Sequence, residues 1–223
     1  MITTDKLLFV DLETTGARQE EDRITEIGII SVESDGRIER WSSFVNPGMP
    51  IPAFIQQLTG IHDWMVADAP SFEALMPELQ PRLEGGLFIA HNARFDYGFL
   101  RHAFARTGYQ FHPDILCTVR LSRLLFPQEK KHNLDTLIER HALVPQARHR
   151  ALADADLLYQ LWGKLKTGFA DDVFTQAVRK LRQSSPAEVT ANEHSKAPRF
   201  AGTQNTRMLA ALISTTEDFP CPD

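Results

Sequence analysis

Two carboxylates lie one residue apart in the stretch FVDLETTG (residues 9–16), where a run of apolar residues ends. Side chains alternate between the two faces of a strand, so Asp11 and Glu13 should project from one face, roughly 7 Å apart along the backbone. At close range, two negative charges repel each other by about 4 kcal/mol at an effective dielectric of about 20. The pattern therefore predicts a cation between them, and a water-exposed turn is the alternative.

Three further residues could complete such a site. Asp96 ends the stretch HNARFD (91–96), in the first turn of a predicted helix, and HRALAD (149–154) contains His149 and Asp154 at the start of another. If these segments converge, four carboxylates and one histidine line a single cleft, and ligands without sulfur suit Mg²⁺ or Mn²⁺ better than zinc. Taken singly, Asp96 could only complement a helix dipole, and Asp154 and His149 could be surface residues.

The three stretches resemble, in this order, the motifs of the DEDDh 3′–5′ exonuclease superfamily, which includes the proofreading epsilon subunit of bacterial DNA polymerase III and ribonuclease T. The similarity covers about residues 5–165 and includes ITEIGII (24–30), LTGI (58–61) and HNLDTL (132–137).

The resemblance implies a two-metal phosphodiester hydrolase that shortens nucleic acids from their 3′ ends and releases nucleoside 5′-monophosphates. Asp11, Glu13 and Asp154 would hold one Mg²⁺ or Mn²⁺ ion, and Asp11 would bridge to a second ion with Asp96. His149 would take the proton of the attacking water, which a near-neutral imidazole can do. The similarity to epsilon subunits implies DNA, most simply single-stranded, as the substrate.

The resemblance also implies a set of contacts to the terminal nucleotides. The residues concerned are Leu12, Thr14, Thr15, Leu58, Gly60, Ile61 and Asn92. Phe95 could stack on a base, but its helical spacing favours a place in the core.

The elements that must position these residues follow from apolar periodicity. Strands are expected over 6–12, 24–32, 38–45 and 87–91. Helices are expected over 52–58, 72–83 after Ser71 as N-cap, 94–106, 118–125, 134–142 after Asn133 and 151–165. Strands that first follow one another and then alternate with helices predict an α/β fold with a mixed sheet, which the resemblance refines to a ribonuclease H-like five-stranded sheet flanked by helices.

The chain divides by composition into a predicted exonuclease domain, residues 1–182, and a polar linker or tail, residues 183–223. Residues 207–213 (RMLAALI) form an apolar island in this tail. It could dock a polymerase or repair partner, and further structure or a core-covering turn are the alternatives.

The whole chain of 223 residues has a net charge of −5, so no global basic field indicates a polyanionic partner. Residues 120–150 nevertheless hold seven basic and three acidic residues, which suits either a nucleic-acid flank or a solvated face. Two distant cysteines indicate a reducing compartment, and no stretch resembles a leader or a membrane span, so a cytoplasmic location is expected.

Two other functions remain open at this stage. A ribonuclease of the same fold would be distinguished by dependence on the 2′-hydroxyl group. A non-catalytic, polymerase-associated binding module should have lost a metal ligand or the base, and here all five positions are filled. No glutamine-led clamp-binding motif is evident, so repair and replication proofreading are both compatible with the sequence.

Overall fold

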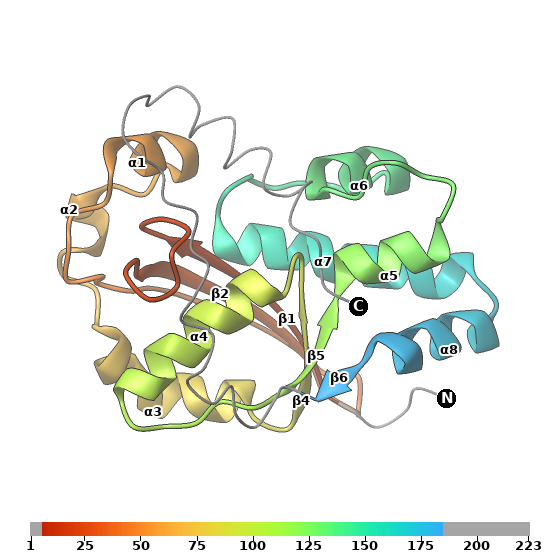
Figure 1. Cartoon of the computed structure of the whole chain (residues 1–223), viewed down its shortest axis with the longest axis horizontal. Coiled ribbons are helices and arrows are strands. Elements are labelled where there is room, and N and C mark those ends of the chain that lie inside the picture. The colour runs from red at the N-terminus through yellow and green to blue at the C-terminus, as the bar shows by residue number, and fades with distance from the viewer. Residues whose placement is uncertain (1–5, 185–223) are drawn as a thin grey trace, which may run out of the picture.

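The structure is a computed structural model that describes residues 6–184 (Figure 1). The predicted docking segment, residues 207–213, and most of the predicted tail lie outside the described residues.

A six-stranded mixed sheet forms the centre of the fold, with the strand order β3-β2-β1-β4-β5-β6. The strands are β1 (Lys6–Thr14), β2 (Ile24–Val32), β3 (Ile38–Phe44), β4 (Gly86–Ala90), β5 (Asp114–Cys117) and β6 (Gln183–Ser184). The first three form an antiparallel meander, β1, β4 and β5 run parallel, and β6 pairs antiparallel with β5. The predicted mixed sheet is thus confirmed, and the two-residue β6 extends it by one strand.

Eight helices surround the sheet in the described part of the chain. They are α1 (Ala53–Thr59), α2 (Asp63–Val66), α3 (Phe72–Leu83), α4 (Arg94–Arg106), α5 (Thr118–Leu125), α6 (Leu134–His141), α7 (Ala151–Gly168) and α8 (Asp171–Leu181). Figure 1 shows α3 and α4 lying together, and α5, α7 and α8 gathered in another group. Among the described residues, no helix is both long enough and apolar enough to span a membrane.

The alternation of side chains along β1 separates two buried clusters. Leu8, Val10 and Leu12 pack with residues of α3 and α4. Phe9 points to the opposite face and packs with residues of α5, α6, α7 and α8. Because the period of a strand is two, Asp11 and Glu13 continue the face of Phe9 and point toward α7.

The helix starts that were expected to be capped are capped by the expected side chains. Ser71 Oγ accepts a hydrogen bond from the Ala74 N–H (3.2 Å), and Asn133 Oδ1 accepts one from the Thr136 N–H (2.8 Å). These bonds satisfy backbone donors that a helix start leaves unpaired.

Four elements were not predicted individually from the sequence: β5, α2, α8 and β6.

Candidate active site

The end of β1 carries the first two carboxylates. β1 is buried between the two helix layers, and Asp11 and Glu13 stand where its α7-facing row of side chains leaves the apolar core. Both are partly buried and line one cavity of about 340 Å³.

The third carboxylate reaches this cavity from the start of α4. β4 runs parallel to β1, so the chain leaves β4 at the same edge of the sheet at which β1 ends. Asn92, with a φ of 57°, turns the chain from β4 into α4. Asp96 then lies in the first turn of α4, only 3% exposed, and lines the cavity.

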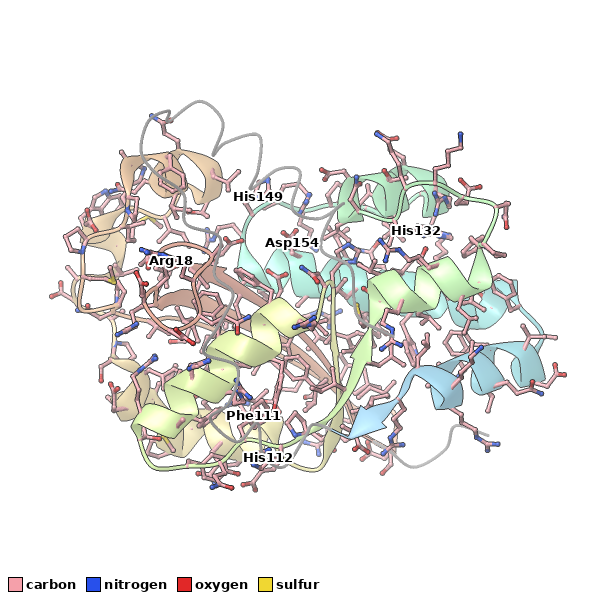
Figure 2. All side chains as sticks on the ribbon, viewed as in Figure 1. Arg18, Phe111, His112, His132, His149 and Asp154 are labelled. Atoms are coloured by element: carbon pink, nitrogen blue, oxygen red, sulfur yellow. The ribbon has the colours of Figure 1, made fainter. Side chains whose placement is uncertain are left out.

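The fourth carboxylate and the histidine come from the start of α7. His149 has a φ of 58°, and Asp154 lies in the first turn of α7, 4% exposed. The backbone N–H of His149 donates to Asp154 Oδ2 (3.3 Å). Figure 2 shows the two side chains near each other at the beginning of this helix, with His132 on a different part of the molecule.

A partly buried ion pair fixes the start of α7 against β2. The Arg150 guanidinium forms a bidentate pair with Glu26, from Nη2 to Oε1 (2.8 Å) and from Nε to Oε2 (3.0 Å). Glu26 Oε2 also accepts from the Ala151 N–H (3.0 Å). Gly28 on the same strand permits this close approach, because a Cβ atom there would lie 2.2 Å from the Ala151 backbone.

All four predicted carboxylates and His149 therefore line one cavity. Glu13, His149 and Asp154 each offer one potential ligand atom, and these atoms lie within 4.8 Å of one another. Motif spacing together with the family resemblance predicted this set, although its members are separated by up to 143 positions, the distance from Asp11 to Asp154.

The acids of the cavity are electrostatically strained. Burial, followed by the charges of Asp154 and Asp96, raises the pKa of Asp11 well above its usual range. Burial raises the pKa of Glu13 to about 8 and that of Asp96 to about 8. Burial also raises the pKa of Asp154, against the opposing effect of the nearby Arg148 guanidinium. A cation among these groups would remove the repulsion.

The donor set fits a hard divalent cation. Carboxylate oxygens dominate it, the imidazoles of His149 and His91 lie beside them, and among the described residues no sulfur atom lines the cavity. Mg²⁺ and Mn²⁺ prefer such oxygen ligands. Burial, followed by the charge of Arg148, lowers the pKa of His149, so its imidazole is largely neutral at neutral pH.

Three of the seven predicted nucleotide contacts line the cavity. Leu12 lies between the two carboxylates of β1, Leu58 comes from α1, and Asn92 precedes α4. Phe95 also lines the cavity while its ring packs against Phe99, with the centroids 4.9 Å apart, so it is both a core and a cavity residue.

The other four do not line this cavity, and each has a structural role. Thr14 Oγ1 donates to the Gly16 carbonyl (2.6 Å), and Thr15 Oγ1 accepts from the Arg23 N–H (2.9 Å). Gly60 ends α1 in a left-handed conformation with a φ of 70°. Ile61 is 1% exposed and packs in a small apolar cluster with α1 and α2. These residues shape the loops beside the cavity, and their direct contact with a nucleotide stays a prediction.

Besides Asn133, which was predicted only as a helix cap, sequence reasoning missed three polar residues that line the cavity: His91, Asp135 and Arg148. His91 Nδ1 lies 2.9 Å from Thr118 Oγ1, while its Nε2 is buried without a hydrogen-bond partner among the described residues. All three lie within or next to the stretches that carried the resemblance, so their proximity to those motifs was the available signal.

Comparison with known proteins finds relatives of this chain among exonucleases. The family model described as Exonuclease (RNase_T) matches residues 8–162, a range that contains all four carboxylates and His149. Among curated proteins, the chain is 38% identical over 181 residues to the 3′-5′ exonuclease DinG of Bacillus subtilis, covering 80% of this chain and 18% of DinG. It is 36% identical over 155 residues to the PolC-type DNA polymerase III of Caldanaerobacter subterraneus, covering 70% of this chain and 11% of the polymerase. The chain thus spans less than a fifth of the length of these relatives.

Solved structures show the same fold. Exonuclease X in complex with 5′ overhanging duplex DNA superposes with a TM-score of 0.59 at 28% identity, covering 77% of this chain and 98% of that chain. E. coli exonuclease I in complex with a dT13 oligonucleotide gives a TM-score of 0.68 at 18% identity, covering 77% of this chain and 43% of that chain. The second likeness supports the fold alone.

Proposed function

Because this chain belongs to the exonuclease (RNase_T) family, we propose that it is a metal-dependent 3′–5′ exonuclease acting on DNA. The observation that carries the proposal is the convergence of Asp11, Glu13, Asp96, Asp154 and His149 on one cavity. Three separate elements, β1, α4 and α7, place these acids in one cavity. Such a convergence is not expected of a chance cluster of surface acids.

We expect the site to bind two divalent cations, Mg²⁺ or Mn²⁺. Asp11, Glu13 and Asp154 would hold the first, and Asp11 and Asp96 the second. When bound, such ions stabilise negative charge on a phosphate and make a water molecule more acidic. They would also allow acids with raised pKa values to lose their protons together.

His149 is the proposed general base. Its neutral imidazole can accept a proton from the water that attacks the terminal phosphodiester. The P–O3′ bond then breaks, the 3′-oxygen of the shortened strand takes up a proton from solvent, and a nucleoside 5′-monophosphate is released. The left-handed backbone at His149 and the Arg150–Glu26 ion pair fix the segment that carries this ring. We therefore expect the orientation of His149 to depend on β2 as well as on α7.

The cavity wall suits a terminal nucleotide. Leu12, Leu58 and Phe95 provide apolar surface for a base or sugar, and Asn92 adds a polar group beside them. The DNA in the structure of exonuclease X, and the name of the PolC-type DNA polymerase relative, support DNA rather than RNA as the substrate.

The proposed cellular role is a broad one. We propose that residues 1–182 act as the exonuclease unit in proofreading or repair, and that residues 183–223 tether it to a polymerase or repair partner. The pairing of β6 with β5 extends the described fold two residues past this boundary.

The direct test is digestion of matched 5′-labelled single-stranded DNA and RNA oligonucleotides in Mg²⁺, Mn²⁺ or EDTA. We expect a metal-dependent ladder that shortens from the 3′ end of DNA, with nucleoside 5′-monophosphates as product. His149→Ala should abolish the ladder. His112→Ala is the matched control, since this exposed histidine lies on another part of the molecule (Figure 2).

Other outcomes would select another function. Faster shortening of RNA would indicate a ribonuclease of the same fold. Binding without cleavage of either polymer would overturn the enzymatic proposal and favour a non-catalytic binding module.

A further inference from the structure

One cation already lies among the acids of the cavity. Arg148 lines the cavity and its side chain is 26% exposed. Its Nη1 forms an ion pair with Asp154 Oδ1. On the other side, its Nε and Nη2 donate to Asp135 Oδ1, at 3.0 and 2.9 Å. The guanidinium therefore joins a buried acid at the start of α7 to an exposed acid on α6.

This pairing conflicts with the proposed metal role of Asp154. One of its oxygens is paired with Arg148, and the other accepts the His149 N–H. A divalent cation bound at the first oxygen would lie at close range to the guanidinium, and the two positive charges would repel each other. The divalent ion and Arg148 should therefore compete for Asp154.

Displacement does not require Arg148 to leave the site. Asp135 is not in the proposed metal set and its side chain is 73% exposed, so its bond to the guanidinium can persist when Asp154 is taken. Four carboxylates would balance two divalent cations, because four negative charges meet four positive ones. Arg148 would then be a positive charge at the cavity that no metal-holding acid neutralises, and a planar guanidinium suits phosphate oxygens.

We propose that Arg148 is an exchangeable cation, which pairs with Asp154 in the metal-free enzyme and binds a phosphate of the 3′-terminal nucleotides once the metals hold Asp154. The inference rests on the proposed function, to which it adds a substrate-binding residue. It makes two measurable demands, competition with metal and contact with phosphate, and both must be met.

Metal binding tests the first demand without any cleavage assay. We would titrate wild type, Arg148→Gln and Arg40→Gln with Mn²⁺ by calorimetry. Arg40 is the matched control, because its guanidinium pairs with Asp156 (3.4 Å), on the same helix as Asp154, and the substitution removes the same charge. Arg148→Gln should bind Mn²⁺ about tenfold more tightly than wild type, a change of about 1.4 kcal/mol, whereas Arg40→Gln should match wild type.

DNA binding tests the second demand. In a His149→Ala background with Mg²⁺, the affinity for a fluorescent single-stranded oligonucleotide would be measured at several salt concentrations. Adding Arg148→Gln should weaken binding about tenfold and reduce the slope of log K against log[salt] by about 0.7, the value for one phosphate contact on a single strand. Adding Arg40→Gln should leave the slope unchanged. A merely structural role of Arg148 would not change the slope.

The failures of the two proposals are distinguishable. If wild type binds Mn²⁺ and DNA but cleaves nothing, the exonuclease proposal fails, and the two Arg148 measurements still decide this inference. If wild type cleaves but Arg148→Gln shows unchanged or weaker Mn²⁺ affinity, or an unchanged salt slope, the Arg148 proposal is overturned. Should Arg148→Gln not fold, Arg148→Lys keeps the charge without the planar fork. Because Lys keeps the charge but not the bidentate geometry, this variant should bind Mn²⁺ more tightly than wild type and single-stranded DNA more weakly, with an unchanged salt slope. An unchanged Mn²⁺ affinity or an unchanged DNA affinity would overturn the proposal.

Discussion

Replacing Glu13 with Gln should stabilise the protein without metal and remove most of its response to divalent cations. Burial, with the charges of Asp154 and other acids, raises the pKa of Glu13 from 4.5 to about 8. The folded protein therefore keeps a proton on Glu13 that the unfolded chain has lost at neutral pH. Its contribution to stability is fully present below the unfolded pKa of 4.5 and is lost as the pH rises to about 8.

The size of the effect follows from the pKa difference. At about pH 7.5, three units above the unfolded pKa, the lost stability is about 4 kcal/mol at about 1.36 kcal/mol per unit. The neighbouring acids share the repulsion, so we expect Glu13→Gln to gain about 2–4 kcal/mol, or about 5–15 °C in Tm. Near pH 5, about half a unit above the unfolded pKa, the gain should be about 1–3 °C.

Thermal unfolding in EDTA and in Mn²⁺, at both pH values, measures this directly. Glu139→Gln on the exposed face of α6 is the matched control and should leave both Tm values unchanged. Mn²⁺ at about a hundredfold excess over its Kd should stabilise wild type by about 2.7 kcal/mol and Glu13→Gln far less. An equal gain of Glu13→Gln at both pH values, or equal stabilisation of both proteins by Mn²⁺, would refute the reasoning.

Three further predictions concern the residues around the site. Arg150→Gln should lower kcat about tenfold with little change in KM and reduce stability by about 2 kcal/mol, because it leaves the buried Glu26 carboxylate without its bidentate partner; an unchanged kcat in steady-state assays would contradict this. Gly28→Ala should lower the free energy of unfolding in urea by about 3 kcal/mol, because its Cβ would lie 2.2 Å from the Ala151 backbone. If the variant is as stable as wild type, α7 can move away from β2 and the prediction is wrong. Burial lowers the pKa of His91 to about 4, so wild type should lose stability as the pH falls from about 6.5 to 4. His91→Gln should not show this loss of stability at low pH. Parallel curves of stability against pH for the two proteins would contradict the prediction.

The parts of the fold that depend on local periodicity could be predicted from the sequence. The strand pattern placed Asp11 and Glu13 on one face because alternation along a strand is a local property. The segments 72–83, 94–106 and 118–125 are helices with the predicted bounds. α8 carried a comparable signal, with acids in its first turn and basic residues in its last, and was nevertheless missed. β5 has only four residues, too few for a visible alternation.

The polar partners inside the cavity could not be predicted in the same way. The sequence shows that Arg148 is charged, but not that it points inward to Asp154 rather than outward like an ordinary basic surface residue. The same holds for Glu26 and Arg150, which lie 124 positions apart and form one ion pair. Such pairings depend on how the end of one element meets another, and neither propensity nor spacing encodes that arrangement.

Several local rules of protein structure are broken in this one cavity, and the coincidence bears on function. In the described part of the chain, three non-glycine residues have a positive φ, and two of them, Asn92 and His149, line the cavity. The buried Nε2 of His91 has no hydrogen-bond partner within residues 6–184, and burial raises the pKa of Glu13 and of Asp96 to about 8. Each feature lowers stability, and such strain persists mainly where the surrounding structure holds it for a functional reason. The strain gathers around all five predicted residues, and a bound cation would relieve the part that comes from the acids, so this cavity is the place in the described fold where function is expected.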